Sequence, residues 1–156
     1  MNAVSVNPAE KVARQGKLSR SIALLKQAAQ DYAHVPAGEA PLISQASSLG
    51  AEDMVISHLI NSLALDIGIF VLETGQLHPQ TLALLERLVP SSRAKVEVFK
   101  PRAEAVVQFV AREGRQAMYK SIELRKACCH IRKMEPLERA LAGKQAWITG
   151  LRREQS

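Results

Sequence analysis

The chain has 156 residues, a net charge of +6 and an apolar fraction of 47%, which suits one globular domain and is not typical of a disordered chain. No apolar run reaches the ~18 residues of a membrane-spanning helix, and the N-terminus lacks the apolar stretch of an export signal. We therefore expect no membrane partner and a cytoplasmic location. Aromatic residues make up only 4%, so nucleic acid is not an expected partner. The positive charge favours an anion such as a nucleotide, phosphate or sulfate.

Apolar residues recur at helical spacing in residues 18–34, and a Pro- and Gly-containing stretch at 35–41 ends this pattern. We expect residues 1–39 to form an N-terminal helical segment and residues 40–156 to form a nucleotide-binding α/β domain. Within that domain, strands are expected at 41–48, 66–74, 94–100 and 144–151, and helices at 51–65, 78–89, 101–114, 116–133 and 135–143. This alternation predicts an α/β fold, a doubly wound and mainly parallel sheet with flanking helices.

Ligands of such sheets bind beyond the carboxyl ends of the strands, so the residues directly after the first two strands are candidates for binding. SSLGAED (47–53) offers hydroxyls, Gly50 and a helix N-terminus to an anion. An ordinary strand–helix turn with acidic residues in the first helical turn explains the same residues. LETGQLHP (72–79) places Thr74 and Gly75 where a tight turn could face a ribose or a base. Each of these two signals is weak alone.

Basic residues come after the third and fourth expected strands. Lys100 and Arg102 come after the third strand, and Arg152 and Arg153 come after the fourth. The two adjacent arginines suit fork-like contacts to phosphate or sulfate, although a solvated charge pair explains them equally well. Taken together, the four strand ends predict a site for a phosphorylated or sulfated nucleotide. Neither GxxxxGK[ST] nor GxGxxG occurs, so the standard P-loop and dinucleotide motifs are excluded.

The two cysteines of the chain, Cys128 and Cys129, are adjacent in KACCHIRK (126–133). A disulfide between them is not expected, because neighbouring Cα atoms lie ~3.8 Å apart and an unstrained disulfide spans ~4.4–6.8 Å. The pair could be buried as small hydrophobic residues. Nearby cations instead favour thiolates, which bind metal; here these are Lys126, Arg132 and Lys133. The dipeptide alone leaves both interpretations open.

Four segments in this order and spacing resemble the assimilatory adenylylsulfate (APS) reductases of bacteria and plants: SSLGAEDMV, LETGQLHPQT, ELRKACCHIRKMEPLERAL and AWITGLRREQS. The first two are shared with phosphoadenylylsulfate (PAPS) reductases and other adenine nucleotide α-hydrolase-like folds. The resemblance implies thioredoxin-dependent reduction of APS to sulfite and AMP in sulfate assimilation and cysteine biosynthesis. Two alternatives are a PAPS reductase, against which the cysteine pair counts, and a non-catalytic nucleotide-binding fragment.

The resemblance also implies roles for individual residues. Cys128 and Cys129 would be two of four thiolate ligands of a [4Fe–4S] cluster, and Lys133 would link that cluster to the substrate. The implied substrate-binding residues are Ser48, Gly50, Glu52, Asp53, Leu72, Thr74, Gly75, Gly150, Arg152 and Arg153. Adjacent residues diverge by ~100° on an ideal helix, so two neighbouring ligands predict a helix end or a distortion at the cysteine pair.

The sequence departs from the family in two ways. Glu73 stands where the family more often has Asp. The family also continues past RREQS with a CxxC pair, which completes the cluster, and with a tail cysteine, the nucleophile. Neither is present here, so no catalytic residue is assigned. We expect a C-terminally truncated portion that neither keeps a four-thiolate cluster nor reduces APS by itself. The oligomeric state stays open, a homo-oligomer included.

Overall fold

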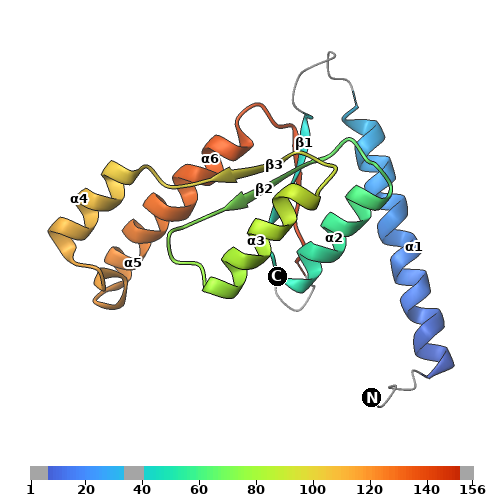
Figure 1. Ribbon diagram of the computed structural model, residues 1–156, viewed down its shortest axis with the longest axis horizontal. Coiled ribbons are helices and arrows are strands. Elements are labelled where there is room, and N and C mark those ends of the chain that lie inside the picture. The colour runs from blue at the N-terminus through green and yellow to red at the C-terminus, as the bar shows by residue number, and fades with distance from the viewer. Residues whose placement is uncertain (1–6, 34–40, 152–156) are drawn as a thin grey trace.

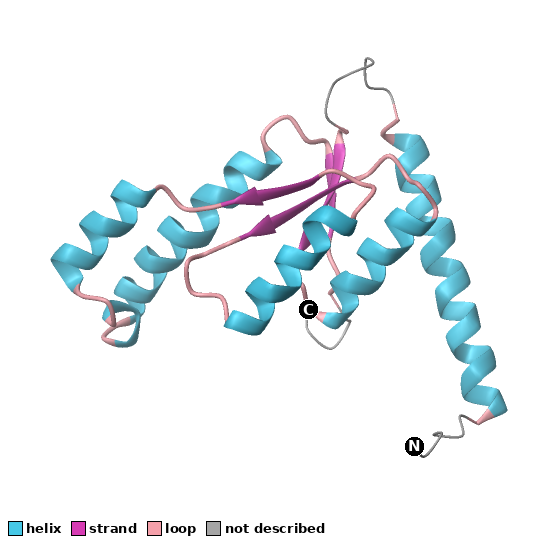
Figure 2. Cartoon of the chain, in the orientation of Figure 1, coloured by secondary structure: helices cyan, strands magenta, loops and turns pink. Residues whose placement is uncertain are grey.

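The computed structural model describes residues 7–33 and 41–151, and within them four strands form one parallel sheet (Figure 1). The strands are β1 (Ile43–Ser47), β2 (Gly68–Leu72), β3 (Val96–Phe99) and β4 (Ala146–Ile148), in the spatial order β3-β2-β1-β4. Helices lie on both faces of the sheet, as Figure 2 shows. The predicted doubly wound α/β fold is therefore confirmed.

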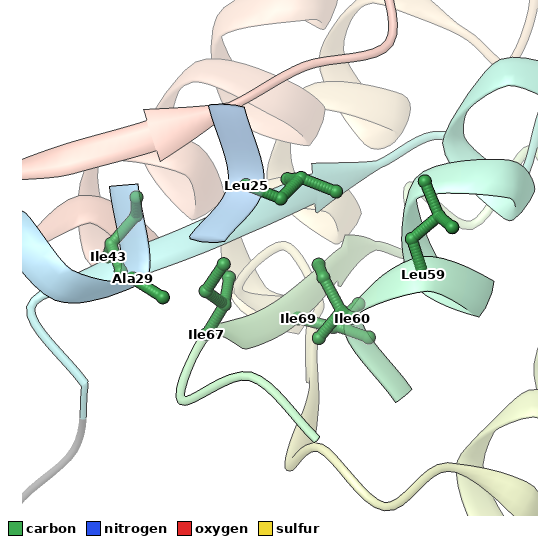
Figure 3. Close-up of a cluster of buried hydrophobic side chains, with 7 residues drawn as sticks. All are labelled: Leu25, Ala29, Ile43, Leu59, Ile60, Ile67 and Ile69. Carbon is green, nitrogen blue, oxygen red and sulfur yellow. The ribbon is translucent and has the colours of Figure 1, made fainter. Parts of the chain in front are cut away.

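Three helices cover one face of the sheet: α1 (Pro8–Asp31), α2 (Ala51–Ser62) and α3 (Pro79–Ser91). Their apolar side chains meet those of β1 and β2 in the main core, which Figure 3 shows and which comprises Leu25, Ala29, Ile43, Leu59, Ile60, Ile67 and Ile69. A smaller cluster packs α3 against β2 through Leu49, Val71, Leu85 and Leu88. These layers pack the sheet against α2, whose N-terminus comes directly after the loop that leaves β1.

The other face is covered by α6 (Glu135–Leu141), which packs on β2 and β3. The rings of Phe70 and Phe99 meet edge to face there, with centroids 6.2 Å apart. The Arg139 guanidinium lies 5.8 Å from the centroid of the Phe99 ring and donates to the Lys100 carbonyl and to Glu135. The hydrogen bond from Arg139 is the largest cause that lowers the pKa of Glu135 below its ordinary value. Arg139 thus fastens α6 to the carboxyl end of β3.

The helical stretch predicted over 116–133 is present but divided into segments of different geometry. The chain forms a 3₁₀ turn (η1, Ala117–Tyr119), helix α5 (Ile122–Cys129) and a π-helical segment (η2, His130–Met134) that runs into α6. The hydroxyl oxygen of Ser121 accepts from the Leu124 amide at 3.2 Å and so starts a new helix. The preceding helix, α4 (Ala103–Glu113), ends at Gly114 as expected.

The N-terminal helix begins earlier than its apolar spacing predicts. Helix α1 extends back to Pro8, and its residues 11–21 are exposed, so none of them belongs to the buried core. Leu25 and Ala29 lie in the same core as the sheet. The predicted boundary between residues 39 and 40 lies outside the described residues and stays a prediction. Along the described ranges, no helix combines the length and the apolar character needed to cross a membrane.

Candidate functional site

The carboxyl ends of the parallel strands meet at one edge of the sheet, and a cavity of about 280 Å³ opens there. Its wall is formed by residues of the strands, of the loops that follow them, of the π-helical segment η2 and of α6. The lining residues are Ala46, Ser47, Ser48, Phe70, Val71, Leu72, Thr74, Leu77, Lys133, Leu137 and Trp147. Predicted residues Ser48, Leu72, Thr74 and Lys133 are therefore brought together. Gly50, Glu52, Asp53, Gly75 and Gly150 do not line this cavity.

The loop after β1 is shaped by its serines. The Ser47 hydroxyl accepts from the Leu49 amide at 3.2 Å, and the Ser48 hydroxyl accepts from the Gly50 amide at 3.3 Å. Leu49 has a positive φ of 64°, which turns the chain sharply into α2. Gly50 is the N-cap of α2, so the positive end of the helix dipole comes directly after the loop that leaves β1. Glu52 is half-buried in that turn.

The loop after β2 is held by backbone and side-chain contacts around Thr74, which is buried. The Glu73 amide donates to the Phe99 carbonyl at 2.9 Å, so the β2–β3 pairing continues one residue past β2. The Glu73 carboxylate accepts from the Gly75 amide at 2.7 Å and lies 3.8 Å from the Lys100 ammonium. Gly75 has a φ of +72°, a left-handed conformation that glycine adopts without strain. The turn predicted for this segment is thus present.

The cysteine pair lies at a break in helical geometry. Helix α5 ends at Cys129, and the π-helical segment η2 begins at His130. Cys128 is half-buried and Cys129 is exposed, so the two thiols are not packed together in an apolar core. Single π-turns inside helices are rare and often mark functional sites. The predicted distortion at the pair is confirmed, whereas the predicted role of the thiols as metal ligands stays a prediction.

A second cavity, of about 520 Å³, contains both cysteines and adjoins the first. Four cations line it together with the thiols: Arg125, Lys126, Arg132 and Lys133. Thr74, Leu77 and Lys133 line both cavities. Lys133 therefore lines both the cavity with the thiol pair and the cavity at the sheet edge, whereas its role as a link between a cluster and the substrate stays a prediction.

Two adjacent thiols are chemically suited to form part of the ligand set of a [4Fe–4S] cluster, and whether they ligate one stays a prediction. Thiolates are the usual ligands of such clusters, and the surrounding cations suit their negative charge. The sequence contains two cysteines, and in the described ranges no three His, Cys, Asp or Glu side chains gather as a metal-binding group. Any further ligands would have to come from elsewhere than the residues around the pair.

Arg132 connects the thiol-bearing segment to the loop after β2, a contact that local sequence patterns did not reveal. Its guanidinium Nη1 donates to the Thr74 carbonyl at 2.7 Å. A Cβ atom placed on Gly75 would lie 2.9 Å from the same nitrogen. A side chain at position 75 would therefore require the Arg132 guanidinium to shift, and the hydrogen bond to the Thr74 carbonyl fixes η2 against the loop.

We expect Arg132→Ala to lower the free energy of unfolding by about 1–2 kcal/mol, because a charge-assisted hydrogen bond to a part-buried carbonyl is lost. Amide hydrogen exchange at Gly75 and Gln76 should accelerate, since their loop loses its anchor. Arg125→Ala is the matched control: it removes the same charge from the same cavity and should change stability by less than about 0.5 kcal/mol. Unchanged exchange at Gly75 and Gln76 in Arg132→Ala would contradict the anchoring role.

The apolar wall of the first cavity was not predicted. Phe70 comes from β2, Leu137 from α6 and Trp147 from the edge strand β4. Trp147 is opposite Ser44 in the β1–β4 register, on the face that α6 only partly covers, and it stays 48% exposed. The single tryptophan of the sequence was the feature that could have indicated this apolar wall. Arg152 and Arg153, predicted to bind an anion, lie outside the described residues.

Comparison with known proteins agrees with this geometry. Residues 42–156 match the family model described as the phosphoadenosine phosphosulfate reductase domain. The chain is 54% identical over 111 residues to an adenosine 5'-phosphosulfate reductase of Burkholderia cepacia and 48% identical over 111 residues to one of Allochromatium vinosum. These matches cover 71% of this chain but 44% and 43% of those relatives, so the chain spans less than half of their length.

A solved structure shares the fold. The crystal structure of a phosphoadenylyl-sulfate reductase from Candida auris, a phosphate complex, aligns with a TM-score of 0.67 and 20% sequence identity, covering 97% of this chain and 71% of that one. The family match extends over most of the chain and contains the strand-end loops, the cysteine pair and Lys133. The chain belongs to the phosphoadenosine phosphosulfate reductase domain family.

Proposed function

We propose that this chain binds APS at the carboxyl edge of its sheet, as the nucleotide-binding portion of a reductase of sulfate assimilation. The adenosine occupies the cavity of about 280 Å³, and the phosphosulfate lies toward the loop after β1 and Lys133. The products are sulfite and AMP, and thioredoxin supplies the electrons. The names of the relatives support APS rather than another anion as the substrate.

One observation carries the proposal most strongly: a cavity with an apolar wall and a polar rim opens where doubly wound sheets bind their ligands. Phe70, Leu137 and Trp147 suit the faces of an adenine. Thr74 offers a hydroxyl, and Lys133 offers an ammonium on the side that faces the thiols. The positive end of the α2 dipole suits the negative charge of a phosphosulfate.

The proposed reaction transfers a sulfonate group from oxygen to sulfur. A thiolate attacks the sulfate sulfur of APS, the bond from that sulfur to the bridging oxygen breaks, and AMP leaves with the electron pair. A thiol of thioredoxin then attacks the resulting thiosulfonate, forms a disulfide and releases sulfite. Within this scheme the described residues bind and orient the nucleotide. Cys128 and Cys129 are not assigned as the nucleophile, because their position suits metal ligation.

Cys128 and Cys129 are proposed to provide two thiolates to a [4Fe–4S] cluster. When bound, such a cluster would supply a centre whose charge and potential depend on the surrounding cations. Lys126 and Arg132 line the cavity of the thiols and would balance their negative charge, and Lys133 would carry that influence toward the nucleotide. Our further expectation is that this chain alone, with two cysteines, does not retain a complete cluster after anaerobic reconstitution.

The single tryptophan lines the proposed adenosine cavity, so its fluorescence provides a direct binding test. We expect a saturable change in Trp147 fluorescence with APS and with AMP, and weaker binding of PAPS, whose additional phosphate the family associates with chains that lack the cysteine pair. A short oligonucleotide is the control for non-specific attraction to the basic surface. Saturable binding of the oligonucleotide but of none of the three nucleotides would overturn the proposal.

A further inference from the structure

Asp53 joins two segments that are far apart in the sequence. It lies in the first turn of α2, and only 7% of it is exposed. Its Oδ2 accepts from the Ser48 amide at 2.7 Å and from the Ser48 hydroxyl at 2.5 Å. Its Oδ1 accepts from the Gly150 amide at 2.8 Å. One carboxylate therefore links the loop after β1 to the chain that leaves β4.

Gly150 makes this link possible because it has no side chain. A Cβ atom at this position would lie 2.5 Å from Asp53 Oδ1 and 3.0 Å from both the Asp53 amide nitrogen and Glu52 Cβ. Real Cβ atoms essentially never come as close as 2.5 Å to another heavy atom, so with any other residue at position 150 either the Asp53 carboxylate or the chain after β4 would have to shift. The contact thus depends on both partners, Asp53 and Gly150.

The backbone of Asp53 is anchored from the centre of the sheet. Gln45 in β1 is fully buried, and its Nε2 donates to the Asp53 carbonyl at 2.7 Å. The amide oxygen of Gln45 in turn accepts from the Ser57 hydroxyl at 2.8 Å. Buried polar networks of this kind are rigid when every member has a partner. The carboxylate is therefore held in place by the central strand and by α2 together.

The link crosses the crevice of the sheet. In the order β3-β2-β1-β4, the chain direction of the crossovers reverses between β1 and β4, and doubly wound sheets bind ligands outside that point. Ser48 comes after β1 and Gly150 comes after β4. Both oxygens of Asp53 accept hydrogen bonds from protein donors, so the carboxylate is engaged within the protein.

We propose that Asp53 is a positioning residue, which fixes the distance between the loop after β1 and the segment after β4. This distance in turn sets the affinity for the phosphosulfate group. This inference rests on the proposed function and deepens it: the sequence resemblance placed Asp53 among the substrate contacts, whereas its hydrogen bonds give it an indirect role. Glycine at position 150 is part of the same arrangement.

The direction in which Asp53→Asn changes the affinity for APS distinguishes a positioning role from a purely electrostatic role. Asp53→Asn removes a negative charge near the anion site, so a purely electrostatic role predicts tighter binding of APS. Ser48 and Gly150, however, donate to different oxygens of Asp53, and in Asn an NH2 group, which is a donor, replaces one of these oxygens and would face one of the two backbone N–H groups. Positioning therefore predicts APS binding that is weaker by about tenfold, as for the loss of a hydrogen bond to a charged group. Binding of adenosine, which has no anionic group, should change less than about twofold.

Gly150→Ala approaches the same contact from the other side and leaves the charge of Asp53 intact. It should weaken APS binding by a similar factor. The double variant should bind APS about as well as the weaker-binding single variant, because the effects of substitutions at contacting residues are not additive. Asp66→Asn, which removes the same charge from the loop before β2, is the matched control and should bind APS like the unsubstituted chain. Trp147 fluorescence measures all affinities.

Two results would count against these ideas in different ways. If the unsubstituted chain binds neither APS nor AMP, the proposed function is overturned, and this inference with it. If the unsubstituted chain binds APS and Asp53→Asn binds it equally well or more tightly, the inference alone is overturned. The same holds if the variants lower the melting temperature but leave the ratio of APS to adenosine affinity unchanged, since that ratio would not respond to a merely structural role.

Discussion

Lys133→Ala is expected to weaken the binding of APS to this chain by about 10- to 100-fold, the range that corresponds to one charge-assisted hydrogen bond. Lys133 is the cation that the described residues contribute to both cavities at the carboxyl edge of the sheet. Its ammonium can therefore reach a phosphosulfate from the side of the thiols. Titration of APS, monitored by Trp147 fluorescence, measures the effect.

Lys126→Ala is the matched control for this prediction. Lys126 carries the same charge and lines the cavity of the thiols, but it does not line the cavity with Trp147. Its removal should change APS affinity by no more than about threefold, a general effect of net charge. Equal losses in the two variants would show that Lys133 acts only through the overall positive field, and that its position between the cavities has no special role.

Ile60→Ala is expected to lower the free energy of unfolding by about 2–5 kcal/mol, because it leaves a cavity in the main core. Ile60 is fully buried in α2, against α1 and the sheet. This helix also positions Asp53 and the loop after β1, so the substitution should weaken nucleotide binding whenever the fold loosens. Urea unfolding monitored by circular dichroism measures the change.

Val55→Ala is the control for an alanine substitution at an exposed position of the same helix, α2. Val55 is 55% exposed, so its truncation removes little buried area and should cost less than about 0.5 kcal/mol. Alanine favours a helix more than valine or isoleucine does, so helix propensity predicts no loss in either variant. Equal destabilisation of the two variants would mean that burial of Ile60 contributes nothing special, and the described core would be contradicted.

The fold could largely be predicted from the sequence, because strands buried on both faces and helices with one apolar face leave different spacings. The middle of β2 is a continuous apolar run, and α2 repeats its apolar positions at helical intervals. The break at Ser121 could not be predicted from that spacing. The break depends on a hydroxyl group that caps a new helix, and the segment after Cys129 depends on a change from α-helical to π-helical backbone hydrogen bonding. The spacing of hydrophobic residues contains no information on either.

The candidate site was predicted in part. The rule that ligands lie beyond the strand ends pointed to Ser48 and Thr74, which do line the cavity. Trp147 and Leu137 were missed because their position depends on how α6 packs across the sheet. The bond from Arg132 to the Thr74 carbonyl joins residues 58 positions apart, and the one from Gly150 to Asp53 spans 97. Contacts at such separations leave no local pattern in a single sequence.

The central claim is that APS binds at the carboxyl edge of the sheet, and amide chemical-shift mapping of the ¹⁵N-labelled chain tests it most directly. Titration with APS should shift the amides of Ser48, Thr74 and Gly75 and the indole resonance of Trp147 together, with one binding constant. A basic cavity at the opposite edge, lined by Arg93 and Lys95 among others, is the internal comparison and should stay unshifted. Shifts confined to that opposite edge, with none at Ser48, Thr74 or Trp147, would contradict the account.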